Sequence, residues 1–269
     1  MSRRLPWALV AAVVLAQVAY PLTEGATRDR LTVVTVLLGC ALSVTHALST
    51  RGPRAAFALM ATTTGGGLAV EVVGVHTGLP FGEYAYSDRL GPRLLGVPLV
   101  VPLAWTWMAW PAWLAAVRLT ASPVWRVAVA TVALAAWDVF LDPQMVAAGQ
   151  WVWHTPIPTL PGVTGVPIGN YLGWLVVSAA MMGALGWSRA AGHAEPADRP
   201  MHVFYLWTYG ASVLAHAVFL DLPGSAFWGG LAMAPVALPL AATTLRRGAD
   251  QRPVSPRSHA RRGIAGRVR

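Results

Sequence analysis

Eight long apolar runs constrain this chain more than any other feature of its sequence. Each is about 17 to 24 residues long, the length that an α-helix needs to cross the hydrocarbon core of a bilayer. The runs cover residues 5–22, 31–49, 55–75, 94–117, 124–141, 171–187, 203–220 and 227–245. We therefore expect an all-α, polytopic integral membrane protein with about eight transmembrane helices, in which residues 1–245 form a single transmembrane domain.

Composition supports a membrane location and narrows the chemistry. Hydrophobic residues make up 55% of the chain and charged residues only 12%, far from the balance of soluble proteins. Cys40 is the only cysteine, which excludes disulfides and cysteine-based metal sites. The stretch 246–269 is rich in Arg, Pro, Gly and Ser. We interpret it as a disordered cytoplasmic tail near anionic lipid and not as a nucleic-acid-binding arm.

Arginine residues predict the orientation of the helices. With eight spans, both termini and every second connecting segment lie on one side of the membrane. These segments contain more arginines than the connecting segments on the other side. Because positively charged loops stay in the cytoplasm, both termini are expected inside. The third, fifth and seventh helices then run outward. The expected location is the cell (plasma) membrane, with several passes through it.

Four acidic residues gather near the outer ends of those three helices: Glu71, Asp138, Asp142 and Asp221. A carboxylate in hydrocarbon is costly and by default marks a functional site. Because Pro143 follows Asp142 directly, we expect Asp142 to end its helix instead of lying on it. Glu71 and Asp138 are the natural catalytic pair, with the other two acids in reserve.

An internal duplication relates Glu71 to Asp138. Aligning these two residues places the sequence GEYAY (82–86) on GQWVW (149–153). After two residues of slippage, the segment 96–99 and Trp105 match the segment 165–168 and Trp174. The repeat is parallel, covers about 65–118 and 132–187, and so relates spans 3–4 to spans 5–6. Membrane proteins of this kind place a site at the interface of their repeats.

The loops that follow the two acids carry repeated aromatic residues. Two interpretations remain open: an interfacial aromatic belt, or an aromatic-lined pocket that holds a polyene or stabilises a cation. The repeated spacing favours the pocket. The candidate binding residues on this side are Tyr84, Tyr86, Trp137, Trp151, Trp153, His76, His154 and Asn170.

No metal or other cofactor is expected. The histidines lack the spacing of known metal motifs. Asp138 and Asp142 do form a D-x-x-x-D pattern, which holds Mg²⁺ with a prenyl diphosphate in membrane prenyltransferases. A second acidic motif and a cationic cluster for the diphosphate are missing from the sequence nearby.

Several long motifs resemble one known family. They are EVVGVHTGLPFGEYAY (71–86), WDVFLDPQM (137–145) and GVPIGNYLGW (165–174). They look like the integral-membrane carotenoid biosynthesis family, which includes hydratases acting on bisanhydrobacterioruberin and on the ψ-ends of γ-carotene or lycopene. The likeness covers about residues 65–187. It implies a hydro-lyase that adds water across a terminal C1=C2 double bond of an acyclic C40 or C50 carotenoid.

The chemistry of such a hydration assigns roles to the residues. A carboxylic acid protonates C2, a tertiary cation forms at C1, and water captures it while a second carboxylate accepts the proton. Glu71 and Asp138 fit these roles in either order. The aromatic faces would shield the cation, and Asn170 would position the water.

The expected partners are a long polyene taken from the bilayer and membrane lipid, without nucleic acid. Association with other membrane enzymes of the same pathway is a further expectation. Two alternatives remain: a magnesium-dependent membrane prenyltransferase or lycopene elongase, and a small proton-coupled transporter.

Overall fold

The computed structural model describes residues 4–154, 158–188 and 192–250, without the side chains of 246–250. The helix α9 (Pro223–Asp250) continues to Asp250. The rest of the expected tail (246–269) lies outside the described residues.

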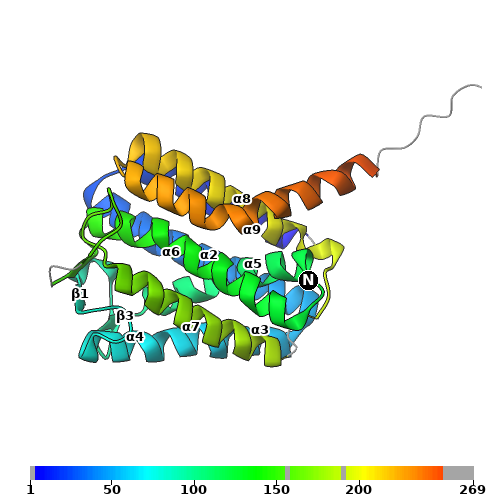
Figure 1. The fold of residues 1–269 in the computed structure, drawn as a ribbon, viewed down its shortest axis with the longest axis horizontal. Helices are drawn as coiled ribbons and strands as arrows, with labels where there is room; N and C mark the ends of the chain where they lie inside the picture. The colour runs from blue at the N-terminus through cyan, green and yellow to red at the C-terminus, as the bar shows by residue number, and fades with distance from the viewer. Residues whose placement is uncertain (1–3, 155–157, 189–191, 251–269) are drawn as a thin grey trace, which may run out of the picture.

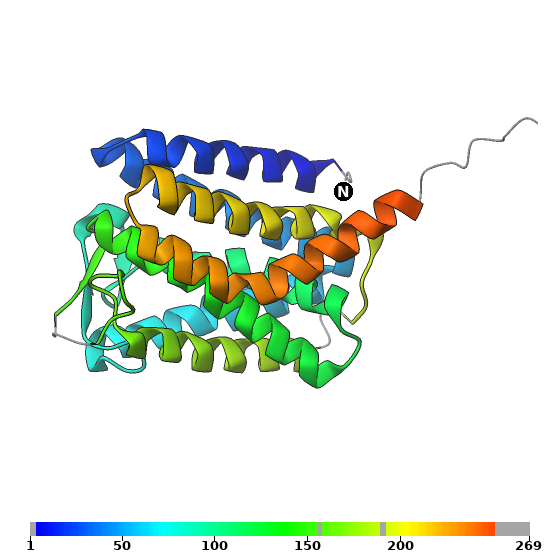
Figure 2. The same cartoon turned by 45° about the horizontal axis from the view of Figure 1, so that its top comes forward.

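Long helices packed side by side form a bundle (Figures 1 and 2). The long helices before the middle of the chain are α1 (Leu5–Ala19), α2 (Gly25–Arg51), α3 (Pro53–Met60), α4 (Gly66–Thr77) and α5 (Val100–Leu119). The later ones are α6 (Pro123–Ala147), α7 (Ile168–Trp187), α8 (Arg199–Leu214) and α9. The short helical turns are η1 (Tyr20–Leu22), η2 (Ala61–Gly65), η3 (Asp88–Leu90), η4 (Pro196–Asp198) and η5 (Ala215–Phe219), of which η2 and η5 are π-helical.

Seven helical stretches within the described residues are long and apolar enough to cross a membrane. One of them joins α3, η2 and α4 into a single stretch, Pro53–Thr77. The expected eighth span, 203–220, is helical as α8 and η5 but is not among the seven. The prediction of an all-α polytopic membrane protein is therefore confirmed. The orientation in the membrane, the domain limits and the repeat stay predictions.

Helix α5 lies at the centre of the bundle. It packs against α2, α6, α8 and α9, and most of its side chains are buried, with Trp105, Met108, Trp110 and Leu114 almost fully inaccessible. A helix that is apolar on all sides is expected in such a position.

Prolines lie inside several helices without ending them, and two of them lie in the central helix or close to the carboxyl groups. Pro111 in α5 and Pro143 in α6 each leave the carbonyl four residues earlier without its helical N–H donor. The Ser43 hydroxyl donates to the Trp107 carbonyl over 2.9 Å, and the Ser225 hydroxyl donates to the Val139 carbonyl over 2.7 Å. Neighbouring helices thus supply the missing hydrogen bonds.

As a result, α6 continues through Pro143 to Ala147. The prediction that Asp142 ends its helix is therefore wrong. The carboxyl group of Asp142 lies on the helix, one turn beyond that of Asp138.

The loops at one end of the bundle contain all the strands of the described residues. Strand β1 (Tyr84–Tyr86) pairs with β4 (Trp151–Trp153), and β2 (Arg93–Leu94) pairs with β3 (Val97–Pro98). The fourth expected span began at residue 94, but α5 begins only at Val100, because Leu95 and Gly96 turn the chain with φ of 52° and 86°. Figure 1 shows the start of α1 and the end of α9 at the opposite end of the bundle from β1.

Candidate active site

A small antiparallel sheet joins the two aromatic loops. Tyr84 lies opposite Trp153, and Tyr86 lies opposite Trp151. In the sequence alignment, however, Tyr84 corresponds to Trp151 and Tyr86 to Trp153. The first aromatic of each motif therefore faces the second aromatic of the other, which is the pairing that a local two-fold axis produces. The first loop follows α4 in the sequence and the second follows α6, so the sheet links the C-terminal ends of these two helices.

Glu71, buried on α4, accepts three hydrogen bonds within the described residues. The hydroxyls of Tyr84 and Tyr86 each donate to Oε2 over 2.6 Å. The indole Nε1 of Trp105 donates to Oε1 over 3.1 Å. Three neutral donors around one carboxyl group favour its negatively charged form, because hydrogen bonds to an ion are stronger than those to a neutral acceptor.

The two tyrosines remain donors over the physiological pH range. Burial raises the pKa of the Tyr84 hydroxyl, and the neighbouring Glu71 carboxylate raises it further. Burial and then Glu71 raise the pKa of Tyr86 in the same way. Both hydroxyls therefore stay protonated at physiological pH and act as hydrogen-bond donors to Glu71.

Asp138 and Asp142 share one amide donor. The Nδ2 of Asn170, at the start of α7, donates to Asp138 Oδ2 over 2.9 Å and also to Asp142 Oδ2. The indole Nε1 of Trp151 donates to Asp142 Oδ1 over 3.2 Å. The other oxygen of Asp138, Oδ1, is buried without a hydrogen-bond partner. This pair of carboxyl groups thus has fewer donors than Glu71 has alone.

A stacked pair of tryptophans lies at the centre of the site. The rings of Trp105 and Trp174 are 3.8 Å apart between centroids and inclined by 14°. These two residues are equivalent in the sequence repeat, so the stack is also what a two-fold relation would produce. Trp105 approaches α4 at Gly67, where an added Cβ would lie 2.8 Å from Cδ1 of the ring. Glycine at this position lets the indole reach Glu71, one turn further along α4.

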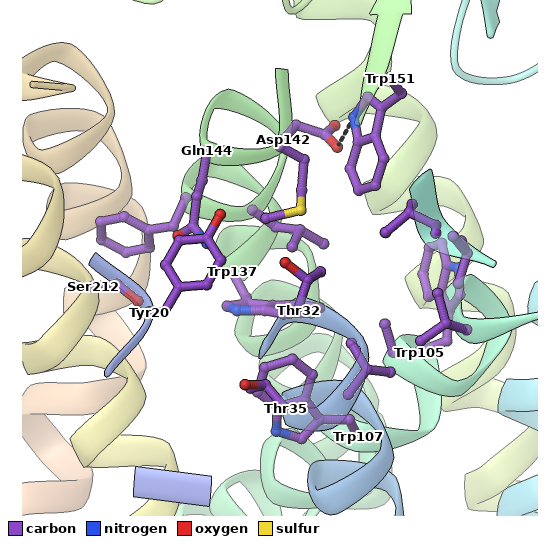
Figure 3. A pocket seen from close by; sticks show the side chains of 18 of the residues that line it. Tyr20, Thr32, Thr35, Trp105, Trp107, Trp137, Asp142, Gln144, Trp151 and Ser212 are labelled. Atoms are coloured by element: carbon purple, nitrogen blue, oxygen red, sulfur yellow. Dashed lines mark hydrogen bonds between the residues drawn. The ribbon is translucent and has the colours of Figure 1, made fainter. Parts of the chain in front are cut away.

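A cavity passes through the site, and its empty volume of about 1250 Å³ includes open solvent. Glu71, Asp142 and Asn170 line it, whereas Asp138 does not. Aromatic side chains form much of its wall: Phe81, Tyr84, Tyr86, Trp105, Trp107, Trp137, Phe140, Trp151, Trp153 and Trp174. Figure 3 shows Asp142 with its bond to Trp151 at one end of the cavity and Trp107 at the other.

Three of the predicted site residues lie elsewhere. Asp221 is exposed, with φ of 54°, and lines a separate small pocket beside Pro143. His76 and His154 are both exposed and do not line the large cavity. The structure therefore brings together Glu71, Asp138, Asp142, Asn170 and the aromatic residues, but neither Asp221 nor the histidines.

Sequence reasoning missed some residues of the cavity. Trp105 and Trp174 marked the repeat but were not proposed as site residues, although their equivalent positions were a usable signal. The side formed by α1, η1 and α2 was not expected at all. It contributes Gln17, Tyr20, Pro21, Thr32, Thr35 and Val36. These residues lie in apolar runs and show no motif.

The geometry defines a class of protein, namely a polytopic helical membrane protein with buried carboxyl groups at an aromatic cavity. The sequence profile of the family described as "Carotenoid biosynthesis protein" matches residues 31–238. The match spans well over half of the chain and includes Glu71, Asp138, Asp142 and Asn170, so the chain belongs to this family. It is thus a multi-pass membrane protein of carotenoid biosynthesis.

One curated relative is similar over part of the chain. The bisanhydrobacterioruberin hydratase of Haloarcula japonica is 35% identical over 154 residues, which cover 55% of this chain and 50% of the relative. The chain thus spans about half of the length of that relative. No solved structure matches the chain. The family and this relative together support an enzyme of carotenoid biosynthesis with a hydratase-like role.

Proposed function

We propose that the protein is a carotenoid hydratase that adds water across the terminal C1=C2 double bond of an acyclic C40 or C50 carotenoid. The observation that carries this proposal is the unequal surroundings of the carboxyl groups in one aromatic cavity. Glu71 accepts three hydrogen bonds from three donors, whereas Asp138 and Asp142 together have two donors, the shared amide of Asn170 and the indole of Trp151. One cavity thus contains an acceptor and a candidate proton donor.

The Asp138–Asp142 pair supplies the proton in this proposal. Two carboxylates that share one donor repel each other, and the repulsion is relieved when the pair holds one proton. Asp142 lines the cavity and Asp138 does not, so Asp142 is the group that protonates C2 and Asp138 supports it. The sequence alone leaves open which carboxyl group is the acid and which is the base, and in this proposal the acid is Asp142.

Glu71 stabilises the cation and accepts the second proton. The π electrons of the double bond form the new C2–H bond, which leaves a tertiary cation at C1. The carboxylate of Glu71 and the faces of the surrounding rings lower the energy of this cation. A water oxygen then forms the C1–O bond and its surplus proton passes to a carboxylate, so no electrons are gained or lost overall. A proton moved between the carboxyl groups restores the starting state.

The substrate is an apolar polyene, and the proposed route of entry is from the lipid. The proposed location is the cell membrane, with orientation as the arginines predict, and with other membrane enzymes of the pathway as neighbours. The aromatic wall fits the end of a polyene better than a charged diphosphate, since arginine and lysine are missing from the lining residues of the cavity among those described.

The test is expression in hosts that accumulate lycopene or bisanhydrobacterioruberin, followed by mass spectrometry of the pigments. The hydratase yields a product heavier by one water molecule per hydrated end. Addition of an isoprenoid C5 unit would instead identify a prenyltransferase. Unchanged pigments together with proton-coupled uptake of a solute would identify a transporter.

A further inference from the structure

Two buried polar atoms beside the acid pair have no hydrogen-bond partner within the described residues: Asp138 Oδ1 on α6 and Tyr171 Oη on α7. Among the unpaired atoms of the described side chains, Asp138 Oδ1 is the only carboxyl oxygen. The Tyr171 hydroxyl interacts electrostatically with both carboxyl groups of the pair, more strongly with Asp138 than with Asp142. Unpaired polar groups in a protein interior are rare and need an explanation.

The packing of α6 against α7 places Tyr171 level with Asp138. At one end of the contact, the Asn170 amide donates to Asp138 Oδ2 over 2.9 Å. At the other end, an added Cβ at Gly186 would lie 3.4 Å from a methyl group of Val127. The two helices run antiparallel between these points, so Tyr171, next to Asn170, belongs to the turn of α7 that faces Asp138.

The donors that reach the two carboxyl groups are unequal. Asp142 has the Trp151 indole on Oδ1 and the Asn170 amide on Oδ2, whereas Asp138 has the Asn170 amide alone. The two groups also interact with each other, but that hydrogen bond forms whichever of them holds the proton. Because hydrogen bonds from donors favour the ionised form of a carboxyl group, these donors alone would place the charge on Asp142 and the proton on Asp138.

That location of the proton does not serve the proposed reaction. Asp138 does not line the cavity, so a proton held there has no direct path to C2 of the carotenoid. A further donor on Asp138 Oδ1 would stabilise the charge on Asp138 and leave the proton on Asp142, which does line the cavity. The Tyr171 hydroxyl is an unpaired donor on the facing helix, and one water molecule commonly bridges polar groups that are too far apart to bond directly.

We propose that Tyr171 is a positioning residue of the acid pair, which donates to a buried water molecule that in turn donates to Asp138 Oδ1. The proposal rests on the proposed hydratase function. A tyrosine hydroxyl can donate and water can both donate and accept, so this bridge satisfies both unpaired atoms. Asp138 then stays ionised, and Asp142 holds the proton that C2 receives. Tyr171 acts through Asp138 and does not line the cavity that receives the substrate.

An apolar carbodiimide, dicyclohexylcarbodiimide, tests where the proton lies, because carbodiimides react with protonated carboxyl groups. Tandem mass spectrometry of peptides then locates the adduct. In the wild-type protein, purified in detergent near neutral pH, we expect an adduct on Asp142 and none on Asp138. Tyr171→Phe removes the hydroxyl at nearly constant shape. It should lower the yield of adduct on Asp142 by about tenfold, the scale of one hydrogen bond to a charged group.

The hydration assay gives a second measurement on the same variant. Tyr171→Phe should lower kcat by about tenfold and leave KM for the polyene unchanged, since the wall of the cavity is intact. Tyr205→Phe is the matched control. Tyr205 is also buried, and its hydroxyl donates to the Ala133 carbonyl of α6 over 3.2 Å, more than one turn before Asp138. Its loss should leave both the adduct on Asp142 and kcat as in the wild type.

Two results would overturn the proposal. One is an equal yield of adduct on Asp142 in Tyr171→Phe and in the wild type, whatever the variant does to hydration. The other is a wild-type protein with the adduct on Asp138 or with none on Asp142, a result that needs no variant. A wild-type protein that carries the adduct on Asp142, loses it in Tyr171→Phe and forms no alcohol would refute the hydratase function, while the labelling would still support the role of Tyr171 at the pair.

Discussion

Glu71→Gln is the substitution that most directly tests the site. It keeps the shape of the side chain but replaces one acceptor oxygen by an NH₂ group. The two tyrosine donors meet at Oε2 and the Trp105 donor meets Oε1. If the amide oxygen faces Tyr84 and Tyr86, the NH₂ group faces the Trp105 N–H, and two donors then lie against each other.

The magnitudes follow from this geometry. One buried donor left without an acceptor costs about 1–3 kcal/mol of unfolding free energy, which a folded membrane protein tolerates in part. Loss of a positioned base or charge lowers the rate by at least about a hundredfold. We therefore expect Glu71→Gln to accumulate as folded protein while its hydration activity falls by at least about a hundredfold.

The assay compares variants at matched protein level in one pigment-producing host, with alcohol quantified by mass spectrometry. Asp88→Asn is the control, because the Asp88 side chain is 98% exposed and pairs with Arg93 at 2.8 Å outside any transmembrane span. It should behave almost as the wild type does. Near-normal hydration by Glu71→Gln would refute the reasoning and make this carboxylate purely structural.

Three further predictions concern metal, packing and topology. Purified protein treated with EDTA should keep its hydration activity, whereas loss that Mg²⁺ restores would favour the prenyltransferase and make Asp138 and Asp142 ligands. Ser225→Ala should lower the free energy of unfolding by about 1–3 kcal/mol, because the Val139 carbonyl loses its donor. The loss should be smaller in a Pro143→Ala background, where the backbone N–H of residue 143 can bond the same carbonyl, and an equal loss in both backgrounds would contradict this explanation. A reporter fused after the last residue should be cytoplasmic and one inserted near residue 159 should be outside, so finding both on one side would contradict the eight-span arrangement.

Much of the site could be predicted from the sequence because local patterns place it. Apolar runs of bilayer length fixed the helices, and the acids at their ends pointed to one end of the bundle. The repeat motif indicated that the loops after Glu71 and Asp138 belong together. The two loops do pair, as β1 with β4. The cavity is lined by Glu71 and Asp142 and not by Asp138, and the catalytic roles of all three stay predictions.

The environments of Asp142 and Asp221 could not be predicted from the sequence, because they depend on contacts between distant segments of the chain. Asp142 lies on the helix because Ser225, far along the chain, bonds the carbonyl that Pro143 frees. No local pattern around Asp142 contains this information. Asp221 ends a Phe-Leu-Asp sequence, as Asp142 does, yet Asp221 is exposed at a bend of the chain. The same three residues thus lead to different environments because different neighbours surround them.

The pairing of Asp138 with Asp142 leads to a last prediction. The two carboxyl groups share the amide of Asn170, so they are expected to act as one proton-holding unit. Asp138→Asn and Asp142→Asn should each remove the shared proton from that unit and lower hydration strongly. Asp142→Asn should have the larger effect, because only Asp142 lines the cavity.

Residues that act as a unit give non-additive losses of activity. The double variant Asp138→Asn/Asp142→Asn should therefore be little worse than Asp142→Asn alone. Likewise, Glu71→Gln combined with Asp138→Asn should be little worse than the worse single variant, since all three carboxyl groups serve one reaction. Multiplied losses in these double variants, measured with the same pigment assay at matched protein level, would mean that the carboxyl groups contribute independently. The proton would then come from a single carboxyl group instead of the pair.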